Sequence, residues 1–325
     1  MRTGPLPILS FFLLALLLLQ CELSVAGSVT ITNYRPVFLI GRTSTGEMRI
    51  AIRQFRKNDL PYLLLVSPFS METSTIPEDS FSPRLGVSSE MSPEIPYIKA
   101  LDRYCASPWK LQNHGLAHAD MPVQGMFLTV DMCPSAKPYE KAFFEYLAGL
   151  SKKRGKDTPV AIAMTGNWML NHRDEFQWLV GLIREGKIAV TWMNHSLSHP
   201  YDPRAPLKRN FLLTPGTDFE HEVLETERIL LENGQTPSPF FRFPGLVADG
   251  TLIKKLRKMA LIPVGSDAWL AKGETPKNGS IILVHGNGNE PSGIKTGLEL
   301  LKGEEGMKLL PLCKAVSDCG RKPAE

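Results

Sequence analysis

Two hydrophobic patterns divide the chain. Between residue 27 and about residue 70, apolar and polar positions alternate with a period of two, most clearly in residues 28–34, 47–55 and 62–69. A period of two is typical of β-strands with one buried face. Residues 71 to about 97 are rich in Ser, Pro and Glu, which indicates a loop or linker. We therefore expect a small β-rich segment at the N-terminal side.

From Val123 onward, short apolar runs alternate with longer segments of helical period. The apolar runs predict strands at 125–131, 159–166, 187–195, 240–244, 261–267, 280–286 and, as a last candidate, 306–312. The helical segments predict helices at 139–155, 172–185, 217–234 and 252–260. Asn171 is expected to cap the second of these helices, and Thr217 with Glu220 to form a capping box for the third.

This order of strands and helices implies a parallel sheet covered by helices. We predict an α/β protein with an incomplete or distorted (β/α) barrel of about seven strands, preceded by the small β-rich segment. A doubly wound open sheet is the alternative. The length of 325 residues suits one large domain with a smaller appendage, and a net charge of +4 gives no indication of nucleic-acid binding.

The first 26 residues have the features of a secretory signal peptide. Arg2 precedes the apolar run "LPILSFFLLALLLL", and "SVA" before Gly27 is a small-residue cleavage signal. A retained anchor is the alternative, but the run is short for a membrane span, and "LLLQC" is a poor lipoprotein box. We expect an exported protein, periplasmic or extracellular, with no stable membrane span after cleavage.

Four cysteines remain after such a cleavage, namely Cys105, Cys133, Cys313 and Cys319. Export allows disulfides, and the short spacing of Cys313 and Cys319 favours a bridge between them. That pairing would leave Cys105 for Cys133, with free thiols as the alternative.

Polar side chains stand at the ends of successive predicted strands. They are Asp131, His195, Arg242, Asp267 and His285. In a parallel barrel these ends converge on one face, where active sites are built. Five such residues at successive strand ends therefore predict a functional site, although each alone has an ordinary structural explanation.

The stretch "NHSLSHP" places His195 and His199 four residues apart directly after a strand. On a helical turn, such residues share one face and could hold a divalent metal, with zinc favoured. The stretch "NHGLAH" holds His114 and His118 at the same spacing. It precedes the first strand of the α/β region, and we interpret it as loop or surface.

Five motifs resemble those of the polysaccharide deacetylase family, the NodB-like group also called carbohydrate esterase family 4. They are "LTVDMCP", "NHSLSHP", "FRFPG", "SDAW" and "LVH", in the order and rough spacing of that family. The resemblance covers residues 122 to about 290. It departs from the family in the first motif, where Met132 replaces a second, metal-binding aspartate. The third motif lacks the usual aromatic after the proline, and the fourth is shortened.

The resemblance implies a division of labour among these residues. Asp131 is expected to be the catalytic base and His285 the general acid, with His195 and His199 holding the metal. Arg242 is expected to orient Asp131, and Asp267 to hydrogen-bond His285. Trp269 is expected to wall the sugar groove.

Two further points come from the residues themselves. Asn167 and Trp168 follow the second predicted strand and are further candidates for lining the groove. A Met132 thioether is a soft, weak donor. The third metal position is therefore left open between Met132, water, Asp202 and Cys133.

Together with these residues, the resemblance implies a metal-dependent enzyme that removes N-acetyl groups from an amino-sugar glycan such as peptidoglycan. An O-acetyl esterase acting on a polysaccharide and a non-catalytic glycan-binding protein are the alternatives. The expected organisation is a signal peptide at 1–26, a β-rich segment with its linker at 27–115, a deacetylase-like catalytic domain at 116–315 and a tail at 316–325.

Overall fold

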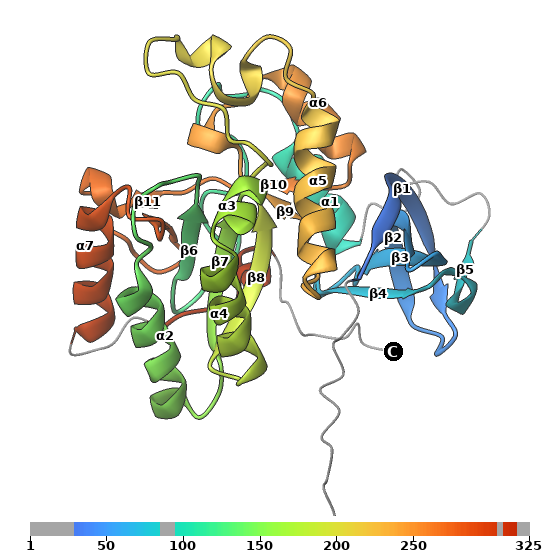
Figure 1. The fold of residues 1–325 in the computed structure, drawn as a ribbon, viewed down its shortest axis with the longest axis horizontal. Helices are drawn as coiled ribbons and strands as arrows, with labels where there is room; N and C mark the ends of the chain where they lie inside the picture. The colour runs from blue at the N-terminus through green and yellow to red at the C-terminus, as the bar shows by residue number, and fades with distance from the viewer. Residues whose placement is uncertain (1–28, 85–94, 304–307, 317–325) are drawn as a thin grey trace, which may run out of the picture.

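A computed structural model of the chain describes residues 29–84, 95–303 and 308–316. These residues form two β-sheets with seven helices (Figure 1). The smaller sheet is antiparallel and comes first in the chain, and the larger sheet is parallel. The predicted signal peptide at 1–26 lies outside the described residues.

The N-terminal sheet has five strands in the order β4-β3-β2-β1-β5. They are β1 (Ile31–Thr43), β2 (Met48–Lys57), β3 (Leu60–Val66), β4 (Thr73–Pro77) and β5 (Phe81–Pro83). The prediction of a β-rich N-terminal segment is confirmed. The prediction that residues 71 to 97 form a loop or linker is wrong for β4 and β5, because Thr73–Pro77 extends the sheet by pairing with β3. Residues 85–94 lie outside the described part.

The larger sheet has seven strands, all parallel, in the order β10-β9-β8-β7-β6-β12-β11. They are β6 (Phe127–Met132), β7 (Thr158–Met164), β8 (Ile188–Asn194), β9 (Phe240–Phe241), β10 (Ile262–Pro263), β11 (Ala268–Trp269) and β12 (Ile281–His285). The two outermost strands, β10 and β11, do not pair with each other. The sheet is thus an open, curled half-barrel, as the sequence predicted.

A segment before β6 runs along the open side of this half-barrel. Leu116 makes a bridge to Val264 beside β10, and His118 makes a bridge to Ser280 at the start of β12. The amide of Ala119 also donates to the carbonyl of Gly279 at 2.9 Å. The chain therefore connects the β10 edge with the start of β12 before it enters the sheet.

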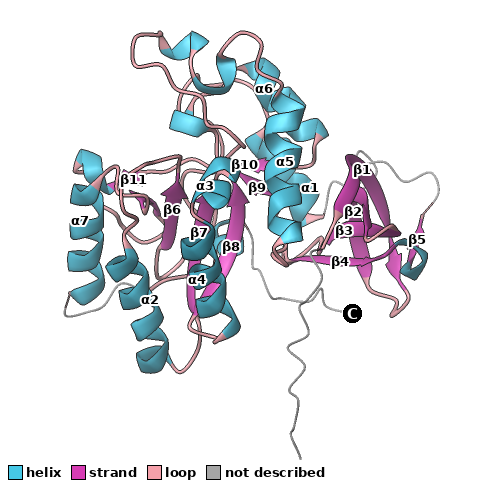
Figure 2. Cartoon of the chain, in the orientation of Figure 1, coloured by secondary structure: helices cyan, strands magenta, loops and turns pink. Residues whose placement is uncertain are grey.

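Helices cover the outer side of the parallel sheet (Figure 2). They are α2 (Lys141–Arg154), α3 (Gly166–Asn171), α4 (Arg173–Arg184), α5 (Phe219–Glu232), α6 (Gly250–Lys258) and α7 (Pro291–Lys302). The remaining helix, α1 (Pro96–Tyr104), precedes the sheet and packs near β10. None of the helices in the described ranges has the length and apolar character needed to cross a bilayer.

Side chains of β6 alternate strictly between two environments. Leu128, Val130 and Met132 belong to the apolar cluster shared with α2, α4 and α7. Phe127 belongs to a second cluster inside the half-barrel, which also takes in side chains of the N-terminal sheet. Because strand side chains alternate, Asp131 faces the interior side. This parity decides which side chains reach the pocket.

Helix α5 lies between the parallel sheet and the N-terminal sheet (Figure 1). It contacts β8 on one side and β1 on the other. The two sheets are therefore connected by the packing of α5 against both of them. Residues of α5 also contact the loop that presents two histidines to the pocket described below.

Three local predictions differ from the structure. Asn171 is the last residue of α3, and His172 stands before α4. The cap of α5 is Asp218, whose Oδ1 accepts from the amide of His221 at 3.1 Å. Thr217 instead donates its hydroxyl to the carbonyl of Thr214 in the preceding turn. Of the predicted strand 306–312, the described residues form only a bridge between Leu309 and Met126.

We expect Asp218→Ala to lower the free energy of unfolding by about 1 kcal/mol, because it leaves an amide of the first turn of α5 without its acceptor. The matched variant Thr217→Ala should change stability by less than about 0.5 kcal/mol, since its hydroxyl serves an exposed turn. Urea unfolding of both variants checks this. A larger loss for Thr217→Ala than for Asp218→Ala would contradict the assignment of the cap.

Candidate functional site

A pocket of about 370 Å³ opens at the carboxyl ends of the parallel strands. Its lining includes Asp131, His195, His199, Trp269 and His285. The carboxyl ends of β6, β11 and β12 supply three of these side chains, and the loop after β8 supplies the two histidines. Five of the residues predicted from strand ends and motifs are thus brought together.

Arg242 is fully buried and contacts Asp131. Its Nη1 donates to Oδ1 of Asp131 at 2.6 Å and to the hydroxyl of Thr129 at 2.7 Å, and its Nη2 donates to the carbonyl of Gly265 at 2.8 Å. The predicted contact between Arg242 and Asp131 is confirmed. Burial raises the pKa of Asp131, but the charges of Arg242 and of two nearby imidazoles outweigh it and hold that pKa below its usual value.

The two histidines of "NHSLSHP" are presented by a loop and not by the helical turn that their spacing suggested. Ser196 and His199 have left-handed backbone conformations, with φ of 69° and 47°. The side chain of Glu222 from α5 accepts from the amide of Ser198 at 2.8 Å and holds the loop in this shape. The two imidazole rings still meet, with centroids 5.0 Å apart.

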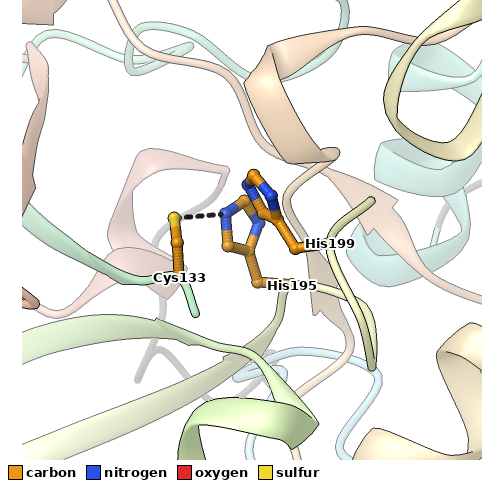
Figure 3. A group of neighbouring side chains, drawn as sticks. All are labelled: Cys133, His195 and His199. Atoms are coloured by element: carbon orange, nitrogen blue, oxygen red, sulfur yellow. Dashed lines mark hydrogen bonds between the residues drawn. The ribbon is translucent and has the colours of Figure 1, made fainter. Parts of the chain in front are cut away.

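Cys133 completes a group of three metal-ligating side chains with His195 and His199. One ligand atom from each residue lies within 4.8 Å of the others, and the three side chains point toward one another (Figure 3). In the described part of the chain, it is the only group of three or more His, Cys, Asp or Glu side chains close enough to share a metal ion. Cys133 follows β6 on the same side of the strand as Asp131, two residues earlier.

The spacing of this group suits zinc. Tetrahedral zinc with Zn–S of about 2.3 Å and Zn–N of about 2.1 Å places sulfur and nitrogen about 3.6 Å apart. Sγ of Cys133 lies 3.5 Å from Nε2 of His195. Nδ1 of His195 lies 2.8 Å from the carbonyl oxygen of Arg242. A hydrogen bond from Nδ1 to that carbonyl leaves the lone pair on Nε2, which is the tautomer that a metal ligand needs.

Electrostatics favour the ligand form of the cysteine. Burial raises the pKa of the Cys133 thiol, but the charges of His199 and His195 outweigh it and hold the pKa well below its usual value. Burial likewise lowers the pKa of His199, and the Cys133 thiolate outweighs it and raises that pKa. The Cys133 thiolate and the His199 imidazolium thus stabilise each other, and a bound divalent cation would displace the proton from His199.

His285 pairs with a partner that the sequence did not identify. Its Nδ1 lies 2.8 Å from Oε2 of Glu290, an ion-pair contact whose angle is poor for a hydrogen bond. Burial lowers the pKa of His285, but contacts with Cys133, Glu290 and Asp131 outweigh it and raise the pKa well above its usual value. The local signal was the acidic residue that ends the turn "HGNGNE".

The predicted contact between Asp267 and His285 is wrong. Oδ2 of Asp267 lies 2.6 Å from Nδ1 of His118, and Oδ1 accepts from the amide of Ile281 at 2.9 Å. The strand β11 ends the sheet beside the "NHGLAH" segment, so the Asp267 carboxylate is held by that segment and by β12. His118 thus has a structural partner, which agrees with its interpretation as loop or surface.

Trp168 and Asn167 do not line the pocket. Trp168 is fully buried and stacks on His172 at a centroid distance of 5.0 Å. It lies on the side of the sheet that carries the helices, because α3 begins directly after β7 and turns outward. Trp269 does line the pocket, and its Nε1 donates to Glu290 at 2.7 Å.

Two aromatic residues of the pocket were missed by the sequence interpretation. Tyr201 is 62% exposed and stacks on Phe211, with centroids 5.2 Å apart. The ring of Phe211 also contacts His199. Phe211 gave no local signal, since the loop that follows His199 folds back to place it. Gly245 allows this approach, because a Cβ there would lie 2.3 Å from the Phe211 ring.

Met132 and Asp202 are both excluded from the third metal position. Met132 is fully buried in the apolar cluster beneath the helices, on the opposite side of β6 from Asp131. Asp202 is exposed and pairs with Arg204 at 3.4 Å. Cys133 is the remaining protein ligand among those considered.

The cysteine pairing differs from the expectation. Cys105 and Cys133 are both free and buried, so the bridge between them is absent. Cys105 lies near the carbonyl of Leu261, in a cluster around α6, and does not line the pocket. Cys313 is disulfide-bonded, and Cys319, its expected partner, lies outside the described residues.

The family described as RP012 protein N-terminal domain matches residues 32–98. Among solved structures, the chain is similar to a family 4 carbohydrate esterase from Bacillus anthracis, with 19% identity over 63% of this chain and 87% of that one, at a TM-score of 0.44. It is also similar to a chitin deacetylase from Colletotrichum lindemuthianum, with 16% identity over 65% and 94% and a TM-score of 0.43.

A family 4 pseudoenzyme from Bacillus anthracis is similar as well, with 15% identity over 60% of this chain and 66% of that one, at a TM-score of 0.38. Enzymes and a pseudoenzyme thus share this weak likeness.

We expect Cys133→Ser to weaken zinc binding by more than the roughly 10- to 100-fold that loss of an outer partner costs. With Co²⁺ as the probe, the wild type should show a thiolate-to-metal absorption band, and Cys133→Ser should lack it. Met132→Leu is the matched control and should leave both the affinity and the band unchanged. A band that survives in Cys133→Ser would exclude Cys133 as a ligand.

Proposed function

We propose that this protein is an exported, metal-dependent hydrolase that removes N-acetyl groups from an amino-sugar glycan. One observation carries the proposal. A metal-ligand group, a carboxylate fixed by a buried arginine and an imidazole paired with a carboxylate share one pocket. Each of these parts has a defined use in acyl transfer to water.

The metal part rests on the fit of its ligands. Cys133, His195 and His199 would hold the ion, with one ligand atom each. Three protein ligands leave a fourth position open, as in catalytic zinc sites. When bound, a divalent ion supplies Lewis-acid polarisation of a carbonyl and lowers the pKa of a water molecule.

Asp131 is the general base in this proposal. Its Oδ1 is engaged by Arg242, while Oδ2 lies 3.7 Å from Nε2 of His195. The free oxygen thus faces the ligand group, and the guanidinium keeps the carboxylate ionised. Asp131 takes a proton from the attacking water as the water oxygen forms its bond to the acetyl carbon.

His285 is the general acid. Breaking the carbon–nitrogen bond of an acetamide requires that the leaving nitrogen receive a proton, because an amide anion is a very poor leaving group. His285 is poised for this, since its contact with Glu290 favours the charged ring. The products are acetate and a free amine on the sugar. A charged imidazole is less needed for an O-acetyl ester, so this pair favours the N-acetyl substrate.

The pocket walls suit a sugar ring. Tyr201 and Phe211 form one aromatic wall and Trp269 lies among the other lining residues. Aromatic faces pack against the apolar faces of sugars while rim groups such as Asn289 and Glu290 offer hydrogen bonds. A volume of about 370 Å³ accommodates a small ligand or one unit of a longer chain.

The proposal is tested by acetate release from zinc-loaded protein on a panel of N-acetylated and O-acetylated glycans, with and without a chelator. Free amine should appear in step with acetate, and the chelator should abolish both. Acetate without amine would reassign the protein as an O-acetyl esterase. Glycan binding without acetate from any substrate would reassign it as a binding protein.

We expect Asp131→Asn to lower turnover of an N-acetylated oligosaccharide by about 10²- to 10⁴-fold, the range for loss of a general base, with zinc content retained. Asp267→Asn makes the same chemical change at a carboxylate that contacts neither the pocket nor His285, and it should keep turnover within a few-fold. Steady-state kinetics and metal analysis of both variants check this. Equal losses in the two variants would refute the role given to Asp131.

We expect His285→Gln to discriminate between leaving groups. Hydrolysis of the acetamide should fall by about 10²- to 10⁴-fold, because the amine loses its proton donor. Hydrolysis of an aryl acetate should fall far less, since a phenolate leaves without protonation. The measurement is the ratio of acetamide to aryl acetate hydrolysis, compared between the variant and the wild type. An unchanged ratio would refute the assignment of His285 as general acid.

A further inference from the structure

One buried ion pair joins the N-terminal sheet to the α/β part. Arg53 of β2 is fully buried, and Glu227 of α5 is 1% exposed. The pair is bidentate, with Nε of Arg53 donating to Oε2 at 2.7 Å and Nη2 donating to Oε1 at 2.9 Å. Nη1 of Arg53 also donates to the carbonyl of Met259 at 2.7 Å. Such satisfied geometry defines the position of α5 closely.

The same helix holds the start of the loop that presents the histidines. Asn194 ends β8, and its Nδ2 donates to the carbonyl of Val223 at 2.8 Å and contacts Oε1 of Glu227 at 3.5 Å. Its Oδ1 accepts from the amide of Ser196 at 2.9 Å. Asn194 therefore fixes the turn that aims His195 into the pocket.

A second carboxylate of α5 holds the other end of the loop. Oε2 of Glu222 accepts from the amide of Ser198 at 2.8 Å, and Oε1 accepts from the Ser198 hydroxyl. Ser198 directly precedes His199. Both histidines are thus aimed by contacts with one helix, so a shift of α5 would shift them together.

Contacts from the N-terminal sheet decide where α5 sits. The hydroxyl of Tyr34 in β1 donates to Oε2 of Glu227 at 2.8 Å, beside the two bonds from Arg53. Glu227 therefore receives three hydrogen bonds from a part of the chain that has no residue among those lining the pocket. These contacts are long-range, with about 170 to 190 residues between the partners.

We propose that Arg53 is a positioning residue for the His195–His199 pair, acting through Glu227 and α5, and that the N-terminal sheet is thereby a working part of the metal site. The inference rests on the metal binding proposed above. Outer partners of metal ligands are commonly worth about 10- to 100-fold in metal affinity. The same scale is expected here.

The test uses the double variant Arg53→Met with Glu227→Met in the full chain. Replacing a buried ion pair by apolar side chains of similar volume is often neutral or stabilising, so folding should be preserved while the anchor of α5 is lost. We expect zinc affinity, measured by chelator competition, to fall by about tenfold or more. Amide exchange at Ser196 and Ser198 should accelerate by about tenfold, because their acceptors are no longer held.

Two further variants make the result decisive. Tyr146→Phe removes a hydrogen bond between α2 and the carbonyl of Leu301 in α7, which involves neither α5 nor the loop. It should leave zinc affinity and both exchange rates unchanged. Tyr34→Phe removes one hydrogen bond to Glu227 and is mild enough to fold, and it should move both measurements in the direction of the double variant.

Wild-type affinity and exchange rates in both the double variant and Tyr34→Phe would overturn the inference. Equal losses in Tyr146→Phe would also overturn it, since they would reflect general stability. If the wild-type protein bound no zinc, the proposed metal function would fail, whereas amide exchange at Ser196 and Ser198 would still decide the positioning role of Arg53.

Discussion

The pocket depends on the hydrogen bonds made by the buried guanidinium of Arg242. An uncompensated charge in this position would cost several kcal/mol, so every donor of the side chain must find an acceptor. The acceptors come from β6 and from the chain beyond β10. The backbone carbonyl of Arg242 accepts from His195 as well. One residue thus positions Asp131, His195 and the strands beside them.

The pleat of β6 is the second constraint. Asp131, Met132 and Cys133 are consecutive, yet only the first and third can face the half-barrel interior. A metal ligand at position 132, next to Asp131, would face the pocket only if the alternation of side chains broke at the end of β6. Cys133, two residues after Asp131, lies beside His195 and His199, while the thioether of Met132 packs beneath the helices. A metal held by Cys133, His195 and His199 would therefore have a sulfur ligand, which favours softer ions.

Most of the fold could be predicted, because the period of two is clear in residues 27 to 70, and apolar runs alternate with helical patterns from 123 to about 300. The convergence of Asp131, His195, Arg242 and His285 followed from parallel topology alone. What failed depended on contacts distant in sequence. Asp267 stands directly before β11 and contacts His118 of the "NHGLAH" segment, whereas Glu290, which follows β12 and precedes α7, reaches His285.

Other errors have the same origin. Trp168 follows a strand as His195 does, but α3 starts at once and carries it outward. Phe211 reaches the pocket through a loop whose path no local pattern encodes. Spacing alone suggested a helical turn for His195 and His199, whereas the loop shape is imposed by Glu222 from another element. Local pattern thus predicts the elements, and tertiary contacts select among their side chains.

The segment that runs along the open side of the half-barrel sets an order of events during synthesis. Residues 112–119 leave the ribosome before any strand of the parallel sheet, yet their partners include Val264 and Ser280, which follow roughly 150 residues later. The segment cannot dock until nearly the whole sheet exists. The hydrogen bond from the Asn113 side chain to the carbonyl of Ser266 can form only at the same late stage. Completion of the half-barrel is consequently a late and highly non-local step, which is the kind of topology that folds slowly.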